Sequence, residues 1–167
     1  QRQMCIRDRS VSVPAGVDSG NRIRLSGKGE AGFRGGPAGD LYIFIAVDPH
    51  PILMRDGADI LTRIPVPMTT AALGGSIDVP TVEGRMARLT IEAGTQSGRR
   101  FRMRGKGMPV LRRSSRGDQI VEVQVETPTN LSKKQKDLLK QFGDTGATSP
   151  ETESFLKRAR RIWADDS

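Results

Sequence analysis

Residues 13–53 read VPAGVDSGNRIRLSGKGEAGFRGGPAGDLYIFIAVDPHPIL, and residues 91–131 read IEAGTQSGRRFRMRGKGMPVLRRSSRGDQIVEVQVETPTNL. The two stretches align without a gap at an offset of 78 residues, and 14 of their 41 positions are identical. The shared frame is A-G-x-x-S-G-x-R-x-R-x-x-G-K-G, followed by R, by G-D and by a closing Leu. A gapless match of this length indicates an internal duplication.

The shared frame predicts a β-hairpin in each copy. Residues 22–25 and 100–103 alternate polar and apolar side chains, as a half-buried strand does, and glycines mark the turns around them. The G-D pair then opens a second strand, over residues 41–47 in the first copy and 120–125 in the second. This strand alternates in the second copy but is apolar on both faces in the first. We therefore expect the first unit to cover or bind something that the second does not.

The segment between the copies predicts further strands around residues 60–66, 76–79 and 86–91. A short helical turn at residues 69–73 is closed by Gly74 and Gly75. A counterpart of this segment in the first unit would fall before residue 1, so we expect the first domain to be incomplete. Residues 1–9 match neither the repeat nor a strand pattern, and we expect them to be non-native or disordered.

After the second copy the pattern changes to that of helices. Ser132 and Gln135 form the sequence signature of a capping box, and Pro150 is typical of a first helical position. The second helix has an apolar face that could pack on the neighbouring β-domain, dock on a second copy of the protein, or lie on a membrane surface. The apolar residues of the two helices are Leu138, Leu139, Phe142, Phe155, Leu156, Ala159, Ile162 and Trp163.

Composition excludes several classes of protein. With 35% hydrophobic residues and 19 glycines among 167 residues, the chain is neither wholly disordered nor fibrous. No apolar run approaches the ~20 residues that cross a bilayer. A single cysteine, Cys5, and a single histidine, His50, argue against a cysteine-based zinc site and against Ser-His-Asp or Cys-His catalysis. We therefore expect a cytoplasmic protein that is not an enzyme.

The net charge of +8 admits acidic partners such as nucleic acid. Residues 99–116 hold eight cationic side chains and no acidic one, but Phe101 is the only aromatic residue among them. Binders of single-stranded nucleic acid interleave such charge with stacking aromatics. Three interpretations remain: a solvated face, a site for an acidic peptide tail, and a nucleic-acid surface.

Two local motifs carry no catalytic prediction. Residues 27–32 match G-x-G-x-x-G, but the following FRGGP cannot form the helix that a dinucleotide site requires. His50 lies in a D-P-H-P stretch, which predicts a structural turn between domains.

Several stretches together resemble a known family. They are VPAGVDSGNRIRLSGKGEAG, GPAGDLY, HPILxRDGADI, AALGG, VPTVEG and GTQSGRRFRMRGKGMP. From about residue 10 to residue 142, and more loosely through the last helix, the chain is similar to the C-terminal substrate-binding region of the DnaJ family of J-domain co-chaperones.

The resemblance implies a mainly β fold of two tandem β-sandwich-like domains, the first one incomplete, followed by C-terminal helices. Residues 10–50 would be the remainder of the first domain, 51–129 the second domain and 130–167 a helical dimerisation segment. That segment would dimerise through Leu138, Leu139, Phe142, Phe155, Leu156 and Trp163.

The resemblance also implies capture of unfolded polypeptide clients and, in the full-length protein, their delivery to the chaperone DnaK. In this family an extended client adds to a sheet edge while an apolar side chain enters a small pocket. Carried over by position, Val11 and Val13 lie on the strand leading from the pocket, and Ile43 lies in the pocket. The full set of peptide-binding candidates is Val11, Val13, Leu41, Ile43 and Ile45.

The sequence departs from the family in two ways. It has no His-Pro-Asp motif, so we do not expect it to stimulate the ATPase of DnaK. It has no C-x-x-C-x-G-x-G repeats, which hold zinc in full-length family members, so we expect no cofactor and no metal in this fragment. The competing class is a basic nucleic-acid-binding β-module.

Overall fold

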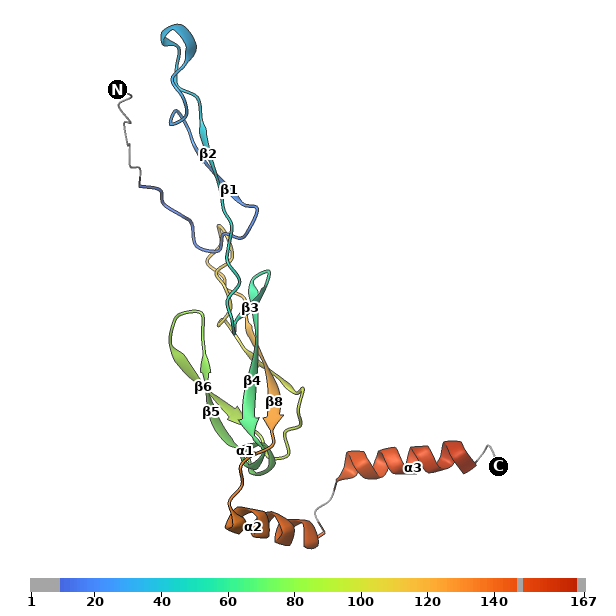
Figure 1. Cartoon of the computed structure of the whole chain (residues 1–167). Coiled ribbons are helices and arrows are strands. Elements are labelled where there is room, and N and C mark those ends of the chain that lie inside the picture. The colour runs from blue at the N-terminus through green and yellow to red at the C-terminus, as the bar shows by residue number, and fades with distance from the viewer. Residues whose placement is uncertain (1–9, 147–148, 165–167) are drawn as a thin grey trace. The chain divides into compact units, whose positions relative to one another are not determined.

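The computed structural model describes residues 10–146 and 149–164, with the side chains of Trp163 and Ala164 left out. The prediction made for residues 1–9 lies outside this described part. The chain divides into two compact units, Gln1–Thr127 and Pro128–Ser167. The first unit contains both copies of the repeat, and the second contains the tail helices (Figure 1).

The first copy forms a two-stranded antiparallel hairpin of β1 (Arg22–Leu25) and β2 (Leu41–Phe44). The strand predicted over residues 41–47 is therefore shorter, although the Ile45 amide still donates to the Asn21 carbonyl at 2.9 Å. No α-helix follows the glycine-rich stretch. The prediction that residues 33–37 are not helical fails in one detail, because η1 (Phe33–Gly35) is a single 3-10 turn, broken by the positive φ of 54° at Arg34.

The second copy belongs to a four-stranded sheet with the order β3-β4-β8-β7. Its strands are β3 (Met54–Asp56), β4 (Asp59–Pro67), β7 (Arg100–Met103) and β8 (Gln119–Glu126). β4 and β8 run parallel and the other pairs are antiparallel. A separate antiparallel pair consists of β5 (Gly75–Pro80) and β6 (Met86–Ile91), and α1 (Met68–Leu73) connects β4 to β5. The predicted strands and the helical turn are confirmed, whereas the short β3 was not predicted.

The hydrophobic core is formed by the second copy together with the segment between the copies. Val66, Ala71, Ile91 and Val123 are buried together, and Phe101 packs against them. Gln119 is also fully buried, and its Nε2 donates to the Thr62 hydroxyl at 3.0 Å and to the Pro80 carbonyl at 2.8 Å. By contrast, no residue from 10 to 59 is buried. The first copy is therefore a hairpin without a core of its own.

The structure confirms the duplication. Arg22 lies opposite Phe44 in the first hairpin, and their equivalents Arg100 and Glu122 lie opposite each other in the second. The hydrogen bonds repeat as well, since the amide of Gly105 donates to Asp118 Oδ1 at 2.8 Å and the equivalent bond to Asp40 in the first copy measures 2.9 Å.

The G-D pair of the frame locks each hairpin. The N–H of Gly105 and then the Arg102 guanidinium, 3.1 Å from Asp118 Oδ2, stabilise the charged carboxylate and hold the pKa of Asp118 below its ordinary value. The equivalent contacts lower the pKa of Asp40. A carboxylate with a lowered pKa stabilises the fold above its ordinary pKa, and this stabilisation is lost as the pH falls through the folded-state pKa.

We therefore predict that Asp118→Asn lowers the thermal unfolding midpoint at neutral pH. The gap to the wild type should narrow as the pH falls below 3.8, the ordinary pKa of the group, because the wild-type carboxylate then becomes protonated too. Thermal unfolding followed by circular dichroism across the acid range measures this. Asp78→Asn, which removes an exposed ion-pair partner of Arg88, is the matched control. A gap that stays constant down to strongly acidic pH would contradict the assignment.

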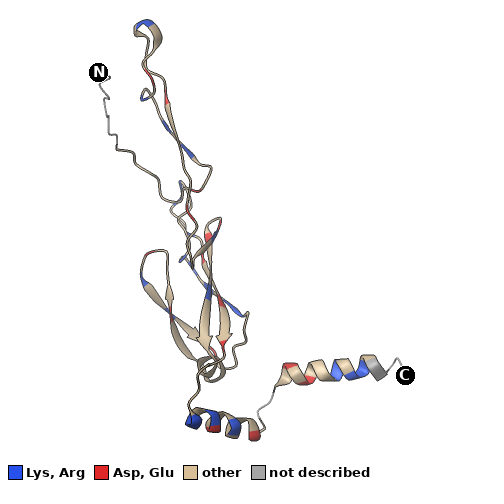
Figure 2. Ribbon diagram, in the orientation of Figure 1, with Lys and Arg blue, Asp and Glu red and all other residues tan. Residues whose placement is uncertain are grey.

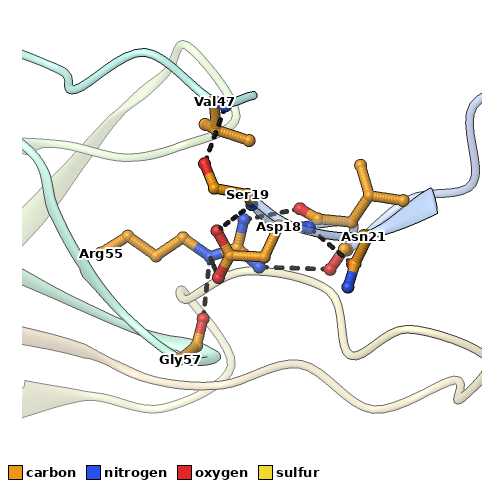
Figure 3. A network of polar contacts seen from close by, with 8 residues as sticks. Asp18, Ser19, Asn21, Val47, Arg55 and Gly57 are labelled. Atoms are coloured by element: carbon orange, nitrogen blue, oxygen red, sulfur yellow. Dashed lines mark hydrogen bonds and ion pairs between the residues drawn. The ribbon is translucent and has the colours of Figure 1, made fainter. Parts of the chain in front are cut away.

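Arg55 on β3 ties the start of the first copy to the four-stranded sheet (Figure 3). Its guanidinium donates to the carbonyls of Val17 at 2.7 Å and Gly16 at 3.2 Å, and it pairs with Asp18 at 3.3 Å. The backbone also meets closely here, because a Cβ at Gly16 would lie 2.4 Å from the Pro109 carbonyl oxygen. Gly16 also has a φ of 88°, which glycine adopts at little cost. The arrangement of the coreless hairpin on the second copy therefore depends on Arg55 and Gly16.

Removing the contacts of the Arg55 guanidinium should make the first hairpin open more readily. We predict that Arg55→Ala lowers the free energy of opening at the amides of Gly20 and Ile45 by about 2 kcal/mol, because charge-assisted hydrogen bonds are lost from a largely covered side chain. Native-state hydrogen exchange measures this opening. Arg88→Ala, at an exposed ion pair, is the control and should change it by less than about 0.5 kcal/mol. Equal effects of the two variants would show that Arg55 does not hold the copies together.

The second unit contains α2 (Lys133–Asp144) and α3 (Pro150–Ala164). The predicted capping box is confirmed, since the Ser132 hydroxyl accepts from the Gln135 amide at 3.3 Å and the Gln135 side chain accepts from the Ser132 amide at 2.8 Å. In α3 the acidic residues occupy the first turn and the basic ones lie toward the end (Figure 2). This order favours the helix because it opposes the helix dipole.

Candidate functional site

The first hairpin has an apolar face that lacks a cover among the described residues. Cross-strand pairing places Ile23 opposite Ile43 and Leu25 opposite Leu41, and Ile45 continues the same row. All five side chains are half-buried and none is buried. We call Ile23, Leu25, Leu41, Ile43 and Ile45 the β1–β2 apolar face.

The second copy shows what normally happens to this face. The equivalents of Leu41, Ile43 and Ile45 are Gln119, Val121 and Val123, which are each at most 1% exposed. α1, β5 and β6, from the segment between the copies, supply residues that pack against this side of the sheet. The same frame thus supports a buried core in one copy and an accessible apolar surface in the other.

One edge of β2 is also unpaired in the described part of the chain. β8 lies between β7 and β4, whereas its counterpart β2 pairs with β1 alone. The free edge presents backbone N–H and C=O groups that can accept another extended strand. An apolar face beside an open edge can bind an extended chain through backbone hydrogen bonds and bury its apolar side chains.

The predicted site residues are only partly brought together. Leu41, Ile43 and Ile45 share one face, but the expectation that Val11 and Val13 lie on a strand is wrong, because residues 10–14 have no regular secondary structure. Pro14 lacks the N–H that a ladder needs and restricts the residue before it. Val11 is half-buried and Val13 is 55% exposed.

Sequence reasoning missed Ile23 and Leu25, which complete the β1–β2 apolar face. Their alternation with Arg22 and Arg24 was the signal that could have identified them. Sequence reasoning also assigned no role to the opposite face of the hairpin, where Tyr42 and Phe44 are 45% and 72% exposed.

The basic run of residues 99–116 is largely paired with acidic residues of its own domain. The Arg116 guanidinium lies 2.9 Å from Glu83 and that of Arg100 lies 2.8 Å from Glu122. This internal pairing favours the solvated-face interpretation over an acidic-tail or nucleic-acid site. The cations in such pairs are Arg99, Arg100, Arg102, Lys106 and Arg116.

The two other motifs have structural roles. His50 Nδ1 accepts from the amides of Ile52 at 3.2 Å and Leu53 at 3.1 Å, which gives His50 a structural role in the bend at residues 51–52. Gly29 in the glycine-rich stretch lies against the G-D pair, because a Cβ there would come 2.7 Å from the Asp40 carbonyl oxygen. The glycine thus serves close backbone packing.

The tail helices expose apolar side chains. Leu138 is 54%, Phe142 61%, Phe155 61% and Leu156 45% exposed, whereas Leu139 is half-buried. The side chain of Trp163 lies outside the described part. Within the described residues, no helix is long and apolar enough to span a membrane. The same residues contain no group of three His, Cys, Asp or Glu side chains placed to hold a metal.

Two duplicated β-hairpins, further strands and a helical tail define the class of this protein as mainly β with C-terminal helices. Residues 5–128 match the family described as DnaJ C terminal domain, and residues 134–165 match the Chaperone protein DnaJ C-terminal region. The chain belongs to the DnaJ C-terminal domain family. Its first match begins at residue 5, within the segment expected to be non-native.

Curated bacterial relatives agree with this assignment. The chain is 56% identical over 158 residues to the Chaperone protein DnaJ of Rhodospirillum centenum, and 54% identical over 160 residues to that of Paramagnetospirillum magneticum. The Rhizobium meliloti protein of the same name is 53% identical over 159 residues. These matches cover 93–94% of the chain but 42% of each relative, so the chain spans less than half the length of these proteins.

Proposed function

We propose that this chain is the substrate-binding region of a co-chaperone, which holds unfolded polypeptide on the first hairpin. In the full-length protein the client would then pass to DnaK. The proposal rests on membership of the DnaJ C-terminal domain family and on the names of its relatives as DnaJ chaperones.

The observation that carries the proposal is the difference between the two copies. Val121 and Val123 are buried under their own domain, whereas the equivalent Ile43 and Ile45 remain accessible. Burying a large aliphatic side chain contributes about 1.5–3 kcal/mol. Uncovered apolar surface beside a free strand edge therefore favours binding of any extended segment that carries apolar residues.

This mode of binding suits a protein that must accept many clients. Backbone hydrogen bonds along β2 are independent of client sequence, because every residue except proline offers an N–H and a C=O. Selection comes from alternate side chains that pack on the β1–β2 apolar face. We propose that Leu41, Ile43 and Ile45 on this face are direct client contacts, and Val11 and Val13 stay candidates from the family resemblance alone.

The tail would join two such chains into a homodimer. Its helices leave Leu138, Phe142, Phe155 and Leu156 exposed, and water-exposed Phe and Leu side chains favour association. We propose that Leu138, Leu139, Phe142, Phe155, Leu156 and Trp163 form the dimer contacts.

Ile43→Asp should weaken client binding about tenfold, because a charge on the face opposes burial of apolar side chains. Binding of a fluorescein-labelled unfolded protein, measured by anisotropy, tests this. Leu73→Asp is the matched control, since Leu73 is 81% exposed on α1 and lies outside the first copy. Unchanged folding of both variants is verified by circular dichroism.

Equal binding by Ile43→Asp and the wild type would remove Ile43 from the site. The same titration at low and high salt separates this proposal from the nucleic-acid alternative. Phosphate contacts weaken steeply with salt, whereas apolar burial does not.

A double variant, Phe142→Asp with Phe155→Asp, should convert the dimer to a monomer, because two charges would enter each apolar contact surface. Sedimentation velocity of the full chain measures the change in mass. Lys136→Asp, at an exposed helical position, is the control for added charge. If the double variant has the same mass as the wild type, these helices do not form the dimer.

A further inference from the structure

A cavity lies at the junction between the first copy and the rest of the first unit. It has a volume of about 630 Å³, within the ~300–1,000 Å³ typical of ligand pockets. It is bounded by the end of the first hairpin, by the turn at His50 and by β3 on one side, and by the loop at residues 81–84 on the other. Its apolar lining consists of Val47, Leu53, Met54, Ile60, Val82 and Met108.

The cavity continues the row of side chains on β2. The amide of Ile45 donates to Asn21, and the amide of Val47 donates to the Ser19 hydroxyl at 2.9 Å, so the chain stays extended and hydrogen-bonded beyond the end of β2. Side chains of an extended chain alternate between faces, which places Val47 after Ile43 and Ile45 in the same row. That row ends in the cavity, where Val47 is part of the lining.

The spacing suits a single bound chain. Ile43 and Val47 are four residues apart, which corresponds to about 13 Å along a strand. When a client strand places one side chain on Ile43, the residue four positions away along that client reaches the cavity. Whether that residue follows or precedes depends on the direction of the client strand.

The carboxylates at the cavity favour a particular kind of residue next to the apolar side chain of the bound client. Asp18 and Asp48 both line it, and Asp18 is paired with Arg55. Asp48 has no ion pair among the residues that the structure describes. His50 Nδ1 is already an acceptor for two backbone amides. The unpaired carboxylate of Asp48 therefore attracts a cationic neighbour of the apolar side chain.

We propose that the junction cavity is a second anchoring site for the polypeptide bound along β2, and that it takes one large apolar side chain next to a basic residue. This inference rests on the proposed function, because it extends the same binding surface. Its residues are Val47, Asp48, Met54, Val82 and Met108. The cavity depends on both copies, so Arg55, which also lines it, positions the two halves of the site.

The test uses the full chain and three fluorescein-labelled peptides of Ser, Thr and Gly. One carries two leucines four positions apart, one replaces the second leucine by serine, and one adds a lysine beside the second leucine. Val82→Asp should weaken the two-leucine peptide about tenfold, the value of one buried leucine, and should leave the one-leucine peptide unchanged. Ile43→Asp should weaken both.

Asp48→Lys provides a second variant at an exposed position, where folding is not at risk. It should weaken the lysine-bearing peptide about threefold at low salt and leave the plain two-leucine peptide unchanged.

Two results would overturn the inference. The first is that Val82→Asp binds the two-leucine peptide as tightly as the control Leu73→Asp. The second is that Val82→Asp, with an unaltered circular dichroism spectrum, weakens the one-leucine peptide equally. If Ile43→Asp has no effect while Val82→Asp still weakens binding, the proposed function on β2 is contradicted and the cavity is supported as an apolar side-chain site.

Discussion

The parallel pairing of β4 with β8 is the constraint on which the first unit depends. It places a strand on the second side of β8, and it aligns Ile64 with Val123 and Val66 with Val125 on one face. That face can then be covered by α1, β5 and β6, which gives the only hydrophobic core among the described residues. The first copy repeats the hairpin without such a pairing, and its apolar side chains stay accessible. The second copy thus contributes to the hydrophobic core, whereas the first copy provides the accessible apolar surface, although both share one sequence frame.

Much of this fold could be predicted from the sequence. The gapless repeat predicted both hairpins, and the matching Asp40 and Asp118 contacts show why the G-D pair recurs. The Ser132 capping box was equally readable, because its residues interact within one helical turn. The β4–β8 pairing was not predictable, since it joins residues about sixty positions apart and leaves no local pattern. β3 is too short for alternation to show.

The candidate site divides in the same way. The family resemblance, carried over by position, identified Leu41, Ile43 and Ile45 as candidates, and the period of a strand places these three on one face. The junction cavity has no sequence signal, since its lining comes from β3, β4 and loops that lie far apart in the sequence. The charge pattern, by contrast, indicated a basic surface that the structure shows to be largely neutralised. Residues 99–116 look like a continuous basic surface, yet Glu83, Glu92 and Glu122 from other segments lie against it. Charge along a chain therefore says little about charge on a surface.

Gln119 has a consequence for how reliably the duplicated chain folds. Both hairpins contain a strand that follows the same G-D pair, so a nascent chain could pair β4 with β2 and form a wrong topology. The residue after the G-D pair is Leu41 in one copy and Gln119 in the other, and only the amide of Gln119 can donate to Thr62 and Pro80. The buried polar side chain of Gln119 therefore favours the pairing of β4 with β8 over its pairing with β2. In a protein with an internal repeat, this preference opposes the wrong topology.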